Sequence, residues 1–161
     1  MTEDLKKVFK ALITLHQELL QKAQEKEAVV KKNDIEGLER IMKEETPLIS
    51  RLEKLELARR QIVQRWLQQQ GIVAEDATME QLKPAFSASD QAAFDELQET
   101  LRAIITEVQQ QNDLNRQLIT ESLRYLNLSL SLVEPQDSFT NYSGRGSEED
   151  GKERSVFDSQ A

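Results

Sequence analysis

Apolar residues recur at intervals of three and four along three long stretches of this chain, which is the spacing of helices that bury one face. The stretches cover about residues 2–31, 34–70 and 89–133. At about 1.5 Å per residue, they predict helices of roughly 45, 55 and 65–70 Å. The predicted stripes are Leu5, Val8, Leu12, Leu15 and Leu19; then Ile35, Leu38, Ile41, Leu48, Leu52, Leu55, Ile62 and Trp66; then Phe94, Leu97, Leu101, Ile104, Ile105 and Val108.

Short polar segments separate the stretches. Asn33 and Glu36 have the spacing of a capping box, so the first two helices should form an antiparallel hairpin with Asn33 as the N-cap. Thr78 and Gln81 have the same spacing and predict a short helix over about residues 78–83, which Pro84 limits.

Three apolar residues of this connection, Met79, Leu82 and Phe86, should close the end of the bundle. Ser87 or Ser89 should cap the third long helix. These elements together predict an all-α fold: an elongated antiparallel three-helix coiled-coil bundle over residues 1–134 with a short connecting helix.

Residues 135–161 differ in composition from the rest of the chain. They are rich in Gly, Ser and charge, with six acidic and three basic residues and no helical stripe, so we expect a disordered acidic tail. Two apolar islands interrupt the tail, Phe139 with Tyr142 and Val156 with Phe157. Each is either inert or a docking motif.

The last turns of the third stretch carry two apolar faces. No charge occurs between Arg124 and Glu134, and on a helix Leu126, Leu130 and Val133 share one face while Leu128 and Leu132 lie roughly opposite. A bundle buries one such stripe against its own chain. We therefore expect Leu126, Leu130 and Val133 to be buried, and the opposite face to receive a foreign helix in the helix-in-groove mode. The expected substrate-binding residues are Leu123, Tyr125, Leu128 and Leu132.

This pattern has other interpretations. The strict alternation of residues 126–133 is also typical of a half-buried strand, although no second strand of similar pattern is available for pairing. The surplus leucines also fit an internal fourth helix or the seam of a homodimer.

Asn112 and Asn115 interrupt the third stripe between Val108 and Leu118. Buried or half-buried amides fix register in coiled coils at a cost in stability. We favour this register-setting role for both residues over direct contact with a partner.

Composition narrows the class of protein. The chain has 161 residues, a net charge of −8 and no cysteine, and its lysines interleave with glutamates instead of forming the basic face that nucleic acid requires. No signal peptide and no apolar run long enough for direct membrane insertion is visible, so we expect a cytoplasmic protein.

Catalysis has little support. His16 is the sole histidine, and neither a phosphate-binding glycine loop nor a thiol is present. We expect no catalytic residues, no metal site and no cofactor.

Three features together resemble the FlgN family of flagellar export chaperones. The first is the leucine stripe from Leu5 to Leu19. The second is the Asn-Asp-Ile-Glu-Gly-Leu turn of residues 33–38, followed by a helix with Leu-Glu-x-Leu-Glu at 52–56 and Arg-Arg at 59–60. The third is Asn-x-x-Asn-x-x-Leu at 112–118, which leads into Leu-x-Tyr-Leu at 123–126. The likeness covers about residues 3–133. In the tail, Tyr142 with Gly144 and Phe157 with Asp158 also resemble the tails of family members.

The resemblance implies a cytoplasmic, non-enzymatic type III secretion chaperone. Such a chaperone binds a helical segment of the hook–filament junction proteins, which are flagellar hook-associated proteins, and prevents their premature assembly. It then delivers them to the flagellar export gate, and the family likeness implies that Tyr125 or a neighbour contacts this gate. The rival interpretation is a coiled-coil adaptor or structural homodimer without a substrate.

Overall fold

The computed structural model describes residues 1–72 and 77–133, and every regular element in these ranges is helical. The long helices are α1 (Thr2–Lys31), α2 (Ile35–Gln69) and α4 (Ala88–Val133), and α3 (Met79–Leu82) with the 3-10 turn η1 (Lys83–Ala85) connects α2 to α4. The all-helical prediction is confirmed for these residues. The strand interpretation of residues 126–133 is wrong because they continue α4. The expectations for residues 135–161 lie outside the described residues.

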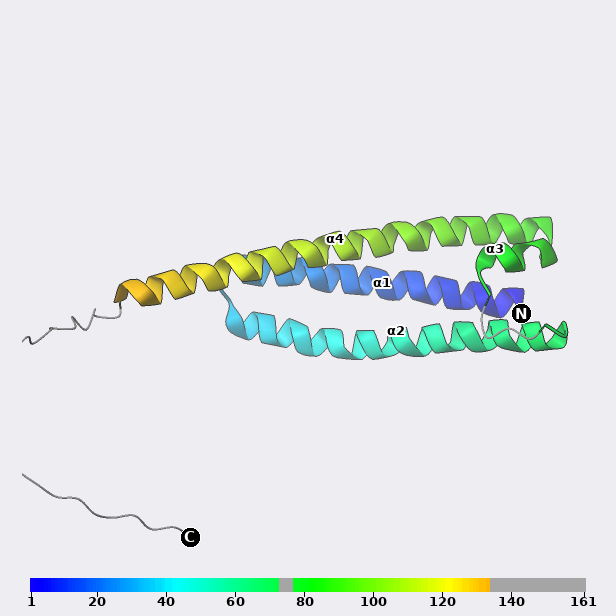
Figure 1. Ribbon diagram of the computed structural model, residues 1–161, viewed down its shortest axis with the longest axis horizontal. Helices are drawn as coiled ribbons and strands as arrows, with labels where there is room; N and C mark the ends of the chain where they lie inside the picture. The colour runs from blue at the N-terminus through cyan, green and yellow to red at the C-terminus, as the bar shows by residue number, and fades with distance from the viewer. Residues whose placement is uncertain (73–76, 134–161) are drawn as a thin grey trace, which may run out of the picture.

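Helix α1 lies between the other two long helices. It packs extensively on α2 and on α4, whereas α2 and α4 make no comparably extensive contact within the described residues. α2 runs antiparallel to α1, and α4 returns parallel to it (Figure 1). The antiparallel three-helix coiled-coil bundle stays a prediction that these contacts do not establish.

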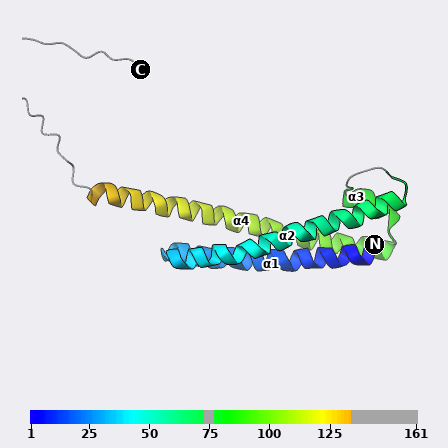
Figure 2. The same cartoon turned by 90° about the horizontal axis from the view of Figure 1, so that it is seen from below.

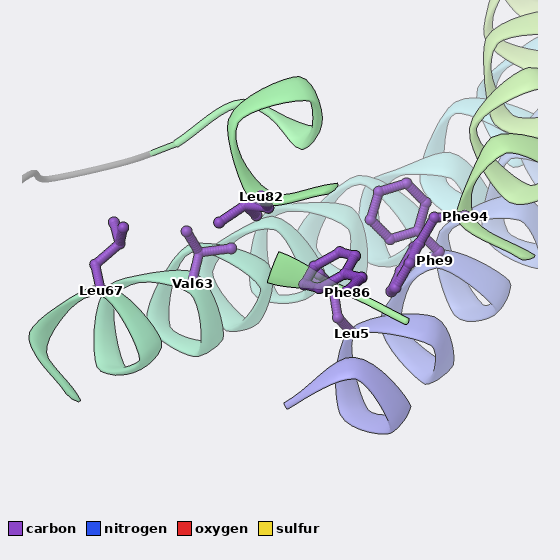
Figure 3. Close-up of a cluster of buried hydrophobic side chains, with 7 residues drawn as sticks. All are labelled: Leu5, Phe9, Val63, Leu67, Leu82, Phe86 and Phe94. Carbon is purple, nitrogen blue, oxygen red and sulfur yellow. The ribbon is translucent and has the colours of Figure 1, made fainter. Parts of the chain in front are cut away.

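The best-packed core lies at the N-terminal end of α1 (Figure 3). Phe94 is fully buried there, edge-on to Phe9 at a centroid distance of 5.8 Å and 5.1 Å from Phe86. Leu82 and Phe86 of the connection are buried in the same cluster and Met79 packs against it, which confirms that this segment closes the bundle. The cluster consists of Leu5, Phe9, Val63, Leu67, Leu82, Phe86 and Phe94.

Local capping explains where the helices begin. Thr78 and Gln81 form the predicted capping box, in which the Gln81 amide donates to Thr78 Oγ1 and the Thr78 amide donates to Gln81 Oε1. Of the two candidate serines, Ser87 accepts a hydrogen bond from the Asp90 amide at 3.2 Å in the first turn of α4.

The expected cap at Asn33 is wrong. Asn33 adopts a left-handed conformation (φ 53°), which asparagine tolerates better than most residues, and this shifts the cap to Asp34. The Asp34 carboxylate accepts a hydrogen bond from the Gly37 amide at 2.9 Å. A Cβ at position 37 would lie 2.3 Å from Asp34 Oδ2, so glycine fits this first turn of α2.

Polar contacts flank the apolar seams and align the helices. Lys6 pairs with Asp90 between α1 and α4, and Lys26 pairs with Glu45 between α1 and α2, both at 2.5 Å. The hydrogen bond from Lys6 is the largest cause that lowers the pKa of Asp90, and the same pair raises the pKa of Lys6. These pairs link α1 to each of the other two long helices.

Candidate functional site

Helix α4 is longer than the helix on which it packs. It has 46 residues against 30 in α1, and both views show its C-terminal end projecting beyond the α1–α2 turn (Figures 1 and 2). Among the bonds between these two helices, those nearest the projecting end link Gln111 to Glu27 and Asn115 to Ala23. We call residues 120–133 the α4 overhang, a segment about 21 Å long.

The α4 overhang exposes large apolar side chains on two opposite sides of the helix. Among the residues expected to bind a substrate, Leu128 is 56% exposed, Tyr125 72% and Leu132 86%. The exposed large apolar residues of the overhang are Leu123, Tyr125, Leu126, Leu128, Leu130, Leu132 and Val133.

The expectation that Leu126, Leu130 and Val133 are buried by the bundle is wrong. These residues are 49%, 63% and 79% exposed. Their stripe faces the side on which α1 packs, but α1 ends at Lys31, so its last turn reaches only the start of the stripe, at Leu126. The protein itself therefore covers neither face of the overhang within the described residues.

The serines of the overhang are less polar than the sequence suggests. The Ser129 hydroxyl donates to the Tyr125 carbonyl at 3.0 Å, and the Ser131 hydroxyl donates to the Leu128 carbonyl at 2.8 Å. Because these two hydroxyl protons already form hydrogen bonds within the helix, a bound partner does not have to supply acceptors for them. Together with the absence of charge between Arg124 and Glu134, this makes the surface suitable for an apolar helix.

An apolar groove of about 240 Å³ lies at the base of the overhang, where the α1–α2 turn approaches α4. Its walls come from three helices, and Ile35 is 61% exposed beside it. The lining residues are Val29, Val30, Asn33, Asp34, Ile35, Leu38, Ile119, Ser122, Leu123 and Leu126.

Sequence reasoning found the α4 side of this groove, because Leu123 was among the expected binding residues. It missed the side made by Val29, Val30, Ile35 and Leu38, since the pattern placed Ile35 and Leu38 in a core stripe. Periodicity shows which residues share a face, but it does not show where the neighbouring helix ends.

The two amides of α4 differ in environment. Asn115 is 2% exposed and donates from Nδ2 to the Ala23 carbonyl at 2.7 Å, while its Oδ1 is buried without a hydrogen-bond partner. Asn112 is exposed, so the expectation of two buried or half-buried amides is wrong for Asn112. A register-setting role stays a prediction, and the burial supports it for Asn115 alone.

The sole histidine of the chain makes a contact within its own helix. His16 is half-buried, and its Nδ1 lies 2.7 Å from the Leu12 carbonyl of its own helix. No cluster of three or more potential metal ligands occurs in residues 1–72 and 77–133. Over the same residues, no helix combines the length and apolar character needed to cross a bilayer.

A helical bundle with an uncovered apolar overhang belongs to the class of proteins that bind other polypeptides. A family model described as FlgN protein matches residues 1–150, and this chain belongs to that family. FlgN proteins are flagellar chaperones and not enzymes.

A protein of Bacillus subtilis (strain 168), described as "Uncharacterized protein YvyG", is 26% identical to this chain over 134 residues. The alignment covers 83% of this chain and 81% of the relative. A comparison with solved structures finds no match.

Proposed function

We propose that this protein is a cytoplasmic type III secretion chaperone that binds a helical segment of flagellar hook–filament junction proteins on its α4 overhang. The chaperone prevents premature assembly of these proteins and delivers them to the export gate. Family membership supports the export role. The observation that carries the binding role is the uncovered apolar surface of residues 123–133.

A helix is the occupant that matches this surface. Leu123, Leu126 and Leu130 follow the three-four spacing by which two helices interlock, and the same surface offers no row of free backbone groups to pair with a strand. Burying three or four leucines contributes about 1.5–3 kcal/mol per fully buried side chain, before the costs of association are subtracted. Such an interface holds a substrate without nucleotide hydrolysis and can release it by competition.

Tyr125 is the residue that we propose for the export gate. Its ring is 72% exposed on the side of α4 opposite to Leu123, and tyrosine is enriched at the centres of protein interfaces. A loaded chaperone could then contact substrate and gate from the same helix.

The binding role is tested by polar substitution of the overhang. A variant with Leu123, Leu126, Leu128, Leu130 and Leu132 changed to Gln should lose co-purification with a junction protein but keep its helicity, because glutamine is a good helix former. The matched control changes three similarly exposed residues of α2 (Met42, Ile49 and Leu57) to Gln and should bind normally. Equal capture by both variants would remove the overhang from the account.

The rival is a homodimer that buries the two overhangs against each other. Two segments of about 21 Å packed against each other would cover only one apolar face of each helix and would leave the exposed leucines of the opposite face uncovered in both copies. Sedimentation of the purified chain should therefore show a monomer. A dimer that the five-leucine variant converts to a monomer would favour the rival.

A further inference from the structure

One face of the α4 overhang continues the stripe by which α4 packs on α1. On a helix with about 100° per residue, Leu126, Leu130 and Val133 lie within about 60° of the direction in which Phe94 and Asn115 point. Phe94 and Asn115 are the two fully buried residues of α4, and both lie in the region that packs with α1. The interface therefore continues on α4 after its partner helix has ended.

The groove marks the point at which the covering helix ends. Val30, in the last turn of α1, is 6% exposed and lines the groove, whereas Leu126 lines the same groove and is 49% exposed. Ile35 and Leu38, from the start of α2, form the wall nearest the α1–α2 turn. Space is thus open beyond the end of α1, with apolar walls on both sides.

We propose that the bound substrate helix lies on the face formed by Leu126, Leu130 and Val133, as a prolongation of α1, with its end turn seated in the groove against Ile35 and Leu38. This inference rests on the proposed function and specifies where on the overhang the substrate binds. The occupant is an amphipathic helix of about four turns, the length that matches the overhang.

The flanks of this face favour close approach of a helix. Ser122 and Ser129 lie seven residues apart on one side of the stripe and are partly buried by their own helix. Small residues at such positions allow two helix axes to come near each other, and the Ser129 hydroxyl is already bonded to the Tyr125 carbonyl. Because no charge lies on this face, the contacting stripe of the substrate is apolar and uncharged.

The opposite face stays free in this arrangement. Tyr125, Leu128 and Leu132 point away from the line of α1 and remain available for a second contact while the substrate is bound. The two apolar faces of the overhang then have different occupants.

Calorimetric titration with a purified hook–filament junction protein from the same organism tests the choice of face. Leu126→Asp/Leu130→Asp should weaken binding about 100-fold or more, because two buried contacts become buried charges without partners. Leu128→Asp/Leu132→Asp is the matched control and should change the Kd by less than about fivefold. Both pairs are exposed in the free protein, and circular dichroism checks that both variants remain helical.

A larger loss in Leu128→Asp/Leu132→Asp than in Leu126→Asp/Leu130→Asp, or equal losses in both, would overturn the assignment of the face while leaving the proposed function intact. Absence of binding by the wild-type chain would instead refute the proposed function.

The groove is tested separately. Ile35→Asp places a charge in the groove wall at the first residue of α2, where an acidic residue suits the helix dipole, and should weaken binding about tenfold. Met42→Asp is the matched control, because Met42 is similarly exposed on α2 but does not line the groove. Equal binding of the junction protein by Ile35→Asp and Met42→Asp would contradict the proposal that the substrate helix lies as a prolongation of α1.

Two other occupants give distinct results. Sedimentation that shows a wild-type dimer and a monomeric Leu126→Asp/Leu130→Asp variant would assign the face to a second copy and overturn the inference. A deletion of residues 134–161 that strengthens binding of the substrate more than tenfold in the wild-type chain, but not in Ile35→Asp, would show that these residues compete with the substrate for the groove and would support the inference.

Discussion

The two ends of the α1–α4 pair use the same kind of stripe and end differently. At one end Phe94 is fully buried in a cluster to which the α2–α4 connection contributes Leu82 and Phe86, with the Phe86 ring 5.1 Å from that of Phe94. At the other end Leu130 is 63% exposed, because the connection between α1 and α2 is short and turns back before it could cover α4. The same apolar periodicity thus gives a buried core or an uncovered surface, according to what the connection supplies.

The largest expected difference between the two ends of the α1–α4 pair is in how much a substitution changes the free energy of unfolding. Phe94→Ala should lower the free energy of unfolding by about 3–5 kcal/mol, because it leaves a cavity among three helices. Leu130→Ala should change it by less than about 0.5 kcal/mol, since the side chain is largely exposed and alanine is the better helix former. Urea denaturation followed by circular dichroism measures both values, and similar losses would mean that Leu130 is buried in solution.

The next effect lies between the two ends, at Asn115. Its Oδ1 is buried without a partner, and the Ala23 carbonyl that accepts from Nδ2 lies within the regular part of α1. Asn115→Leu should therefore raise the free energy of unfolding by about 1 kcal/mol, because an unsatisfied acceptor is replaced by an apolar group of similar shape. A loss of stability in the same urea experiment would show that the amide hydrogen bond outweighs the unsatisfied acceptor.

The turn beside the groove gives an effect of similar size. Asp34→Ala should cost about 1 kcal/mol, because it removes the N-cap of α2. In Gly37→Ala the new methyl group displaces the Asp34 carboxylate, so the cap is already lost and the gain in helix propensity roughly offsets it. Asp34→Ala should then have almost no effect in the Gly37→Ala background, and additive losses in a double-mutant cycle would contradict this coupling.

The smallest effect is the dependence of stability on pH at the closed end. The pKa of Asp90 is lower in the folded chain than in the unfolded chain, chiefly because Lys6 donates a hydrogen bond to its carboxylate. The pair therefore stabilises the fold at pH values above the unfolded pKa of about 3.9. That contribution is lost as the pH falls through the folded pKa. Asp90→Asn should reduce the loss of stability between about pH 5 and pH 3, whereas Asp113→Asn, at an exposed site, should not. Identical acid profiles for wild type and Asp90→Asn would refute the coupling.

The sequence predicts the helices well because three-four spacing and capping residues act locally. Leu5, Leu12 and Leu15 are buried as their stripe requires, and the Thr78 box forms as its spacing indicates. Phe9 is also buried but lies beside the predicted stripe, where it meets Phe94.

The errors about burial in the α4 overhang share one physical cause. Burial of Leu126 and Leu130 depends on where α1 ends relative to α4, and these two helices meet through packing at the closed end and through the Lys6–Asp90 and Asn115–Ala23 contacts. None of these tertiary contacts is visible in the spacing of residues along the chain. The groove was missed for the same reason.

Hydrogen exchange of residues 120–133, measured in the free chain and in its complex with a junction protein, tests most directly that a partner helix covers the α4 overhang. In the free chain these amides should exchange much faster than those around Leu12, because no second helix holds the overhang closed. In the complex they should become strongly protected, while exchange around Leu12 stays unchanged. Protection of the overhang in the free chain equal to that of the core, or unchanged exchange in the complex, would contradict the account.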